Sequence, residues 1–221
     1  MPPSTHPPRK SPMSNYRRPP TSTLLPLFLV ALTLAGCAGL ERPAQESAGD
    51  WNTHRQQLVS LNQWRADGKV ALRSAQGADS ASLVWQQRGN NTDLLLSGPI
   101  GLGATRIQSD GKHLDINRGG ELQRIDISSP DAVARATGWD LPLAALRHWL
   151  KGAPAPDLAI QALDLDRQQG LLLHLRQAGW DIHYQHYRDF DGLRLPTRLH
   201  IERGPTEARI LIAQWQLPPD R

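Results

Sequence analysis

Apolar and polar residues alternate along most of the chain from residue 64 onward, with the period of two that is typical of half-buried β-strands. In the first run, every second residue from Trp64 to Leu72 is apolar or small, and most of the residues between them are charged. Turn signals separate the runs, and Asp110-Gly111 is the strongest because this pair favours a tight hairpin. Gly77 and Ala78 are expected in the turn between the first two runs. The pattern predicts about eleven antiparallel strands, at residues 64–73, 80–86, 92–97, 104–109, 113–117, 121–127, 161–167, 171–177, 180–187, 195–203 and 208–217.

Three segments have helical periodicity instead. Between Asp50 and Leu61, apolar residues recur at spacings of three and four, and Asp50 is a typical N-cap. Two shorter helices are predicted at 131–136 and 142–150. Many short strands joined by hairpin turns imply a large curled sheet or barrel. Helices inserted after the sixth strand would cover one face or mouth of it, because their apolar stripe must be buried.

The residues before this domain have the order of a secretory signal peptide. Arg17 and Arg18 precede an apolar run at 24–34, which ends in Leu34-Ala35-Gly36-Cys37. Such a run spans about 16 Å as a helix, at ~1.5 Å per residue, and is too short for ~30 Å of hydrocarbon. The ending resembles the bacterial lipobox, where cleavage leaves the cysteine first and its sulfur carries a diacylglycerol. We expect Cys37 to be a lipid anchor; the alternative is a free structural cysteine behind an ordinary signal peptide.

These features divide the chain into three parts. Residues 1–36 are expected to be a lipoprotein signal peptide, with Met13 as an alternative translation start because a proline-rich stretch precedes it. Residues 37–50 are expected to form the lipidated N-terminus and a polar tether, and residues 51–221 the barrel domain. Ala38 is not aspartate, and by resemblance to bacterial sorting rules such a residue directs a lipoprotein to the outer membrane.

The charge of the chain changes once the leader is set aside. The whole sequence has 25 basic and 21 acidic residues, and the leader contributes four basic residues and no acidic ones. The remaining chain is therefore neutral and has no nucleic-acid-binding motif, so no nucleic-acid partner is expected. Cys37 is the single cysteine, so the domain must be stable in an oxidising compartment without disulfides.

A search for catalytic chemistry finds no serine-nucleophile elbow, zinc-protease helix, phosphate loop or dinucleotide fingerprint. His183 and His186 are three residues apart on a predicted strand, so they point to opposite faces and are not expected to share a metal. Acidic pairs such as Asp164 and Asp166 could act in general acid–base catalysis, but acids are common at strand ends. We predict a protein that is not an enzyme and has no metal or other cofactor.

One predicted loop, at 98–103, is unusually apolar. Ile100 and Leu102 lie there among glycines, whereas surface loops are mostly polar. A phosphate-binding loop does not fit, because no helix follows. Two interpretations remain: the loop folds back onto the core, or its apolar tip enters a membrane, where burying one isoleucine contributes roughly 1.5–3 kcal/mol.

Several short motifs together resemble the LolB family of outer-membrane lipoprotein receptors. The resemblance extends from Cys37 to near the end of the chain. The motifs are Trp64 followed by Gly68-Lys69 and Leu72-Arg73, then Trp85-Gln86-Gln87, Gly98-Pro99-Ile100-Gly101, Gly138-Trp139-x-Leu141-Pro142, Trp149-Leu150-x-Gly152 and Gly179-Trp180-x-Ile182-x-Tyr184.

The resemblance implies a fold and a function. The fold is mainly β, an incomplete (unclosed) antiparallel barrel of about eleven strands with a lid of short α-helices, and it encloses an apolar cavity for acyl chains. The implied function is that of a monomeric receptor that accepts triacylated lipoproteins from the soluble periplasmic carrier LolA and inserts them into the outer membrane without nucleotide hydrolysis. The related carrier LolA has no lipid anchor, so the expected diacylglycerol and N-acyl chain on Cys37 argue against assigning this chain as the carrier.

The resemblance also assigns the loop, because family members carry a hydrophobic residue between its proline and glycine. Ile100 has this membrane-insertion role, with Pro99, Gly101 and Leu102 around it. Alternation gives candidates for the cavity without saying which face lines it. The lid candidates are Leu143, Leu146, Trp149 and Leu150. The cavity candidates are Trp64, Val70, Leu72, Leu83, Trp85, Leu94, Leu96, Ile182, Tyr184, Leu199, Ile201 and Ile210.

Two other classes of function remain as alternatives. A structural or scaffolding outer-membrane lipoprotein would have a barrel filled by its own side chains. A membrane-tethered hydrolase would need a nucleophile and a base, which the sequence does not display.

Overall fold

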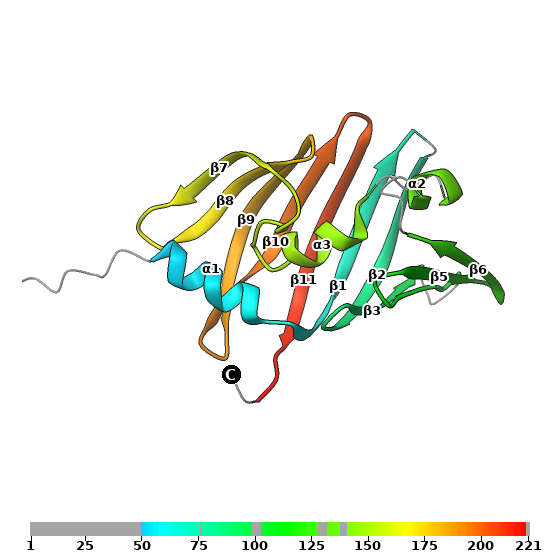
Figure 1. Cartoon of the computed structure of the whole chain (residues 1–221), viewed down its shortest axis with the longest axis horizontal. Coiled ribbons are helices and arrows are strands. Elements are labelled where there is room, and N and C mark those ends of the chain that lie inside the picture. Colours follow the sequence, from blue (N-terminus) through cyan, green and yellow to red (C-terminus); the bar gives the residue numbers. More distant parts are fainter. Residues whose placement is uncertain (1–49, 76, 99–102, 128–131, 138–140, 220–221) are drawn as a thin grey trace, which may run out of the picture. The chain divides into compact units, whose positions relative to one another are not determined.

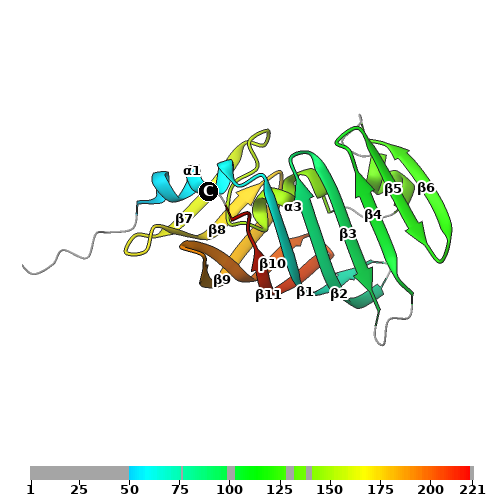
Figure 2. The same ribbon diagram turned by 90° about the horizontal axis from the view of Figure 1, so that it is seen from below.

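A single antiparallel sheet of eleven strands runs through the chain in the computed structural model, which describes residues 50–75, 77–98, 103–127, 132–137 and 141–219. The order of the strands across the sheet is β6-β5-β4-β3-β2-β1-β11-β10-β9-β8-β7 (Figures 1 and 2). The strands are β1 (Gln63–Ser74), β2 (Gly77–Arg88), β3 (Asn91–Ser97), β4 (Thr105–Ser109), β5 (His113–Arg118), β6 (Glu121–Asp126), β7 (Ile160–Asp166), β8 (Leu171–Gln177), β9 (Trp180–Phe190), β10 (Leu193–Arg203) and β11 (Thr206–Gln216).

The topology is that of two meanders joined in the middle. β1 pairs with β2 on one side and with β11 on the other, so the first and last strands are neighbours. Among the described residues, β6 and β7 are the two edges and do not pair with each other. The predicted fold, an unclosed antiparallel sheet of eleven strands with short helices, is therefore confirmed.

The described residues include three helices beside the sheet: α1 (Trp51–Ser60), α2 (Ala132–Thr137) and α3 (Leu143–Trp149). α1 begins as predicted, because the Asp50 carboxylate accepts hydrogen bonds from the Asn52 backbone N–H at 2.9 Å and the Thr53 hydroxyl at 2.6 Å. α1 and α3 lie over the same face of the sheet (Figure 1). Within the described ranges, no helix has the length and hydropathy that a membrane crossing requires.

Tryptophan side chains fill the centre of the covered face. The Trp64 ring lies 5.7 Å from that of Trp85 and 5.2 Å from that of Trp215, centroid to centroid. Each of the latter two indoles keeps a partner for its N–H: Trp85 donates to the Gln87 side chain at 3.0 Å and Trp215 to the Pro196 carbonyl at 3.0 Å. Trp64, Trp85 and Trp215 are thus core residues, and the N–H groups of Trp85 and Trp215 are satisfied.

The close approach of β1 and β11 depends on a glycine. The register between the two strands shifts between Asp67 and Gly68, which marks a β-bulge. A Cβ atom at Gly68 would lie 2.1 Å from the Leu211 carbonyl oxygen. Only a residue without a side chain therefore fits at this point of the sheet.

Two predicted turns differ from the structure. Gly77 and Ala78, expected in a turn, are the first residues of β2, because they pair with Ser74 and Arg73 of β1. The β9–β10 hairpin is also longer than predicted. Its turn is Asp191-Gly192, with φ of 53° and 79°, a geometry that Asp-Gly adopts readily.

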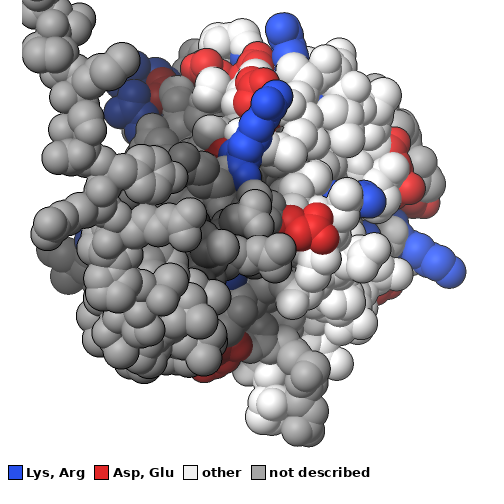
Figure 3. All heavy atoms as spheres, turned by 90° about the vertical axis from the view of Figure 1, so that its left-hand side faces the viewer, with Lys and Arg blue, Asp and Glu red and all other residues white. Residues whose placement is uncertain are grey.

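The surface charges are consistent with the neutral balance of the sequence after the leader. Lysine and arginine side chains are interspersed with acidic ones on the described part of the face in Figure 3.

Candidate functional site: an apolar cavity beside helix α3

A cavity of about 390 Å³ lies between the inner face of the sheet and the helices α2 and α3. This volume is within the roughly 300–1,000 Å³ range of pockets that bind small molecules. Most of its walls are aliphatic or aromatic, so it favours an apolar occupant. The apolar lining residues are Val70, Leu72, Ala81, Leu83, Trp85, Leu94, Leu96, Ile107, Leu114, Ile116, Val133, Leu141, Leu143, Leu146, Ala208 and Ile210.

The polar lining residues gather at one end of the strands. Ser74, Gly77, Asp79 and Ser80 come from the β1–β2 hairpin, and Arg118 is the last residue of β5. The Arg118 guanidinium donates a hydrogen bond to the Thr105 hydroxyl at 3.3 Å. This polar end is the mouth of the cavity, because charged groups remain there in contact with water.

Helix α3 contributes one side to the cavity and the other to the packed core. Leu143 and Leu146 line the cavity, whereas Trp149 and Leu150 are fully buried away from it. The Trp149 indole donates to the Gln177 side chain at 2.8 Å, and the Tyr184 hydroxyl donates to the Trp149 carbonyl at 2.9 Å. Two of the four lid candidates therefore face the cavity, and the other two attach the helix to the sheet.

A buried lysine holds the segment after α3 against α1. Lys151 Nζ donates hydrogen bonds to the Leu58 and Leu61 carbonyl oxygens, both at 2.6 Å, at the C-terminal end of α1. Burial, with a smaller contribution from the Arg147 charge, lowers the pKa of Lys151 to about 8. Burial also lowers the pKa of the neighbouring His148 to about 4, helped by the charges of Lys151 and Arg147. The C-terminal end of α3 is thus held in place by specific polar contacts.

The inner face of the sheet divides into an open and a filled half. Seven of the twelve cavity candidates line the cavity, and all come from β1, β2, β3 and β11: Val70, Leu72, Leu83, Trp85, Leu94, Leu96 and Ile210. The other five share the inner face but belong to the packed core: Trp64, Ile182, Tyr184, Leu199 and Ile201. Over β8 to β10 the face is covered, for example by Trp149, whose ring lies 6.3 Å from that of Trp180.

Some lining residues were not among the candidates. Ile107 comes from β4, and Leu114 and Ile116 come from β5. Their alternation in predicted strands 104–109 and 113–117 was the signal that could have identified them.

The loop candidates Pro99, Ile100, Gly101 and Leu102 lie outside the described residues, as does Cys37. The ends of the loop, however, are placed by strand pairing. Leu96 of β3 pairs with Thr105 of β4, and Thr105 pairs with Arg118. Because Leu96 and Arg118 both line the cavity, the β3–β4 connection begins and ends beside the mouth.

Three histidines, His174, His183 and His200, lie side by side on neighbouring strands of the outer face. The His183 ring stacks on the His174 ring, with centroids 4.6 Å apart, and lies 6.3 Å from the His200 ring. His174 is 3.0 Å from the Asp181 carboxylate, and His200 is 3.0 Å from the Glu207 carboxylate. In the described part of the chain, no group of three or more His, Cys, Asp or Glu side chains has an arrangement that could hold a metal ion.

Comparison with known proteins decides the family. The family described as "Outer membrane lipoprotein LolB" matches residues 62–215. Proteins named outer-membrane lipoprotein LolB are similar over most of their length. The one from Halorhodospira halophila is 37% identical over 197 residues, covering 89% of this chain and 96% of its own. The one from Ectopseudomonas mendocina is 40% identical over 204 residues, covering 87% and 95%. This chain belongs to the LolB family.

Membership of the LolB family sets the location and the general role. The chain is an outer-membrane lipoprotein of the Gram-negative type, and the family supports a role in lipoprotein localisation. The LolB family is not an established enzyme family.

Solved structures agree with the LolB assignment at the level of the fold. A LolA superfamily protein from Nitrosomonas europaea aligns with a TM-score of 0.51 at 11% identity, over 79% of this chain and 96% of that one. A protein described as a putative outer membrane lipoprotein-sorting protein domain, from Vibrio parahaemolyticus, aligns with a TM-score of 0.50 at 9% identity, over 76% and 92%.

Proposed function

We propose that this LolB-family chain is a receptor that accepts lipoproteins from the periplasmic carrier LolA and inserts them into the outer membrane. The observation that carries the proposal is the apolar cavity with a polar mouth beside α3. The proposal includes a signal peptide at 1–36, a lipid anchor on Cys37 with a tether to residue 50, and a monomeric domain from residue 51 onward. It needs no cofactor, because no bond is made or broken.

The energetics of acyl chains explain why such a cavity is required. A triacylated lipoprotein carries on the order of 45 methylenes, and exposing each of them to water costs about 0.8 kcal/mol. The total is tens of kcal/mol, so the chains must stay covered between carrier and bilayer. Apolar walls cover them without holding any one atom by a directional contact, which allows the chains to leave again.

In this proposal α3 acts as a lid, and the size of the cavity supports this role. A volume of about 390 Å³ lies near the lower end of the range for pockets that hold a single small molecule. Several acyl chains need more room than this. Leu143 and Leu146 must therefore move away from β1–β5 when a lipoprotein enters, while Trp149 and Lys151 keep the C-terminal end of the helix in place.

The apolar loop supplies the last step of the proposed pathway. Since its ends lie beside the mouth, Ile100 can reach a bilayer from the same side on which acyl chains leave. Transfer then runs downhill, from carrier to cavity to membrane, and nucleotide hydrolysis is not required.

Two neighbouring residues of α3 give a matched test of the cavity. Leu143 lines the cavity and is half-buried, whereas Ala144 is exposed. Full-length protein in liposomes is mixed with a LolA–lipoprotein complex in the absence of ATP, and the membrane-bound lipoprotein is measured. We expect wild type and Ala144→Glu to transfer the lipoprotein and Leu143→Glu to lose most of the transfer. Failure of the folded wild type to take up lipoprotein would contradict the receptor function and favour the scaffolding alternative.

A further inference from the structure

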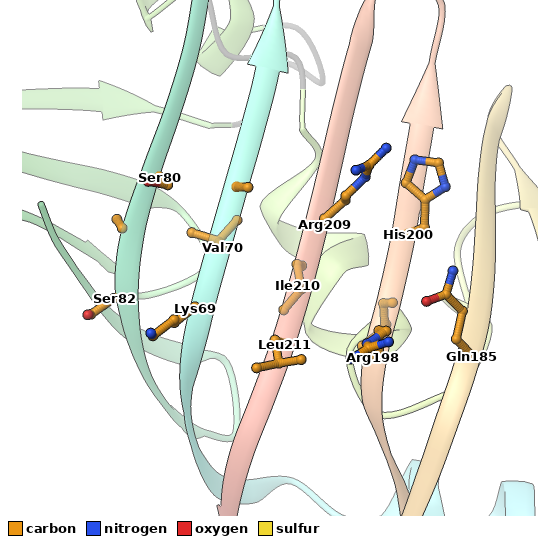
Figure 4. A pocket seen from close by; sticks show the side chains of 13 residues that line it. Lys69, Val70, Ser80, Ser82, Gln185, Arg198, His200, Arg209, Ile210 and Leu211 are labelled. Atoms are coloured by element: carbon orange, nitrogen blue, oxygen red, sulfur yellow. The ribbon is translucent and has the colours of Figure 1, made fainter. Parts of the chain in front are cut away.

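A second hollow lies on the opposite, outer face of the sheet. It is a groove of about 700 Å³ across β2, β1, β11, β10 and β9 (Figure 4). Small side chains, Ala71, Ser80 and Ser82, line it on β1 and β2. Three of these strands, β2, β1 and β11, line the apolar cavity with their inner face, so the sheet lies between the two sites.

Strand pairing places a cation, an aliphatic side chain and a second cation in one row across the groove. Lys69 of β1 pairs with Leu211 of β11, and Leu211 pairs with Arg198 of β10. All three side chains line the groove and lie in this order in Figure 4. Because neighbouring strands are about 4.8 Å apart, the positions of the two cations are separated by about 10 Å.

Many charges on the outer face of this sheet are neutralised locally. Arg65 pairs with Asp67 at 2.7 Å, Arg124 with Asp115 at 2.6 Å, and Arg209 with Glu207 at 2.7 Å.

Lys69 and Arg198 differ from these arginines. Both side chains are exposed, and neither forms an ion pair with any residue that the structure describes. Leu211 between them is 41% exposed, which makes it one of the larger exposed aliphatic side chains of the sheet. The row thus offers two free positive charges around an uncovered apolar residue.

We propose that this groove binds an extended acidic segment of a periplasmic partner protein. Two carboxylates of the segment, four residues apart and therefore on one face of it, would lie about 13 Å apart at ~3.3 Å per residue and contact the long, flexible side chains of Lys69 and Arg198. An apolar side chain between them would cover Leu211. Ion pairs of this kind contribute modestly each, so the affinity comes from the pairs together with the apolar contact.

The shape and place of the groove favour a polypeptide over a membrane surface. A flat bilayer contacts protruding side chains, whereas this row lies in a hollow. Lys69 is also about 16 Å along β1 from Ser74 at the mouth end, at about 3.3 Å per residue. This inference does not rest on the acyl-chain role of the cavity.

Zero-length cross-linking tests the site directly. The full-length protein in detergent is mixed with the peptide Gly-Glu-Ser-Leu-Ser-Glu-Gly, whose two glutamates and leucine share one face when it is extended, and a carbodiimide joins its carboxylates to lysine amines. Lys112, exposed in the β4–β5 turn, is the internal control. We expect about tenfold more adduct on Lys69 than on Lys112, which corresponds to a difference of about 1.4 kcal/mol. Arg198→Glu should lower the Lys69 adduct to the level of Lys112, and Leu211→Ser should lower it several-fold.

Four outcomes would overturn the proposal. Equal adducts on the two lysines, or a Lys69 adduct that Arg198→Glu leaves unchanged, would show that no site exists. Protein–protein adducts through Lys69 without peptide would identify a second copy of the chain as the occupant. Binding to phosphatidylglycerol vesicles that is lost in Lys69→Glu/Arg198→Glu and not reduced by the peptide would identify a membrane.

Discussion

Lys151 Nζ lies 2.6 Å from the carbonyl oxygen of Leu58, a residue 93 positions earlier in the chain, and so joins the segment after α3 to the end of α1. Lys151 is 3% exposed, and backbone carbonyls at α1 accept hydrogen bonds from its ammonium group. A charge in this position is unfavourable relative to water, which lowers the pKa of Lys151 to about 8. The same contact that joins the end of α3 to α1 therefore makes stability depend on pH.

Comparing the free energy of unfolding of the wild type with that of Lys151→Met at several pH values tests this dependence. The folded-state pKa is lower than the unfolded value of about 10.5, so between pH 8 and 10.5 the unfolded chain binds the proton and the folded one does not. Stability of the wild type relative to the variant should rise through this window, by up to a few kcal/mol, at ~1.4 kcal/mol per pH unit. Below pH 8 the difference should be constant.

Urea unfolding of both proteins at several pH values gives the difference in the free energy of unfolding. Tyr184 and Tyr187, whose pKa values burial raises, are present in both proteins, so their effect cancels. A difference that falls or stays flat between pH 8 and 10.5 would contradict the buried, charged lysine.

The bulge at Gly68 predicts a second stability effect. Gly68→Ala puts a methyl group against the Leu211 carbonyl and must push β1 away from β11, at an expected loss of about 2–4 kcal/mol in the free energy of unfolding.

Gly204→Ala is the control for Gly68→Ala. Gly204 has φ of 55° and open space around its missing Cβ, so it reports backbone strain alone, about 1 kcal/mol. Equal losses in the two variants, measured by urea unfolding, would show that the sheet does not need the close approach at Gly68.

The strands could be predicted from the sequence because hairpin pairing and alternation are local. Leu83 and Leu199 show the limit of this reasoning. Both alternate with polar neighbours and both face inward, yet Leu83 lines the cavity and Leu199 is packed in the core. What separates them is the cover supplied by α3 from a distant part of the chain, which periodicity does not encode.

Lys151 shows a different limit. A lysine between a helix and a proline-rich connector is usually exposed. Its burial depends on two carbonyl groups about ninety residues away, so no local pattern reveals it.

Ile100 should be needed after the lipoprotein has been received, not before. Replacing it by glutamate removes roughly 1.5–3 kcal/mol of membrane contact, which corresponds to about a ten- to hundredfold slower insertion. Ile100→Glu should therefore accumulate lipoprotein on the receptor, whereas Ile100→Leu should insert it at the wild-type rate. Both steps can be followed in liposomes, by co-purification of the lipoprotein with the receptor and by its protection in the membrane. Insertion by Ile100→Glu at the parental rate would rule out the role of the loop.

The most direct test of the acyl-chain cavity uses two adjacent residues of β3. Leu96 lines the cavity, and Leu95 points to the opposite face of the sheet, where it is 37% exposed. A photo-reactive amino acid at either position, followed by illumination with a lipoprotein that carries radiolabelled acyl chains, reports which face meets the lipid. We expect a labelled adduct from position 96 and none from position 95. Labelling from position 95 alone, or equally from both, would contradict the binding of acyl chains in this cavity.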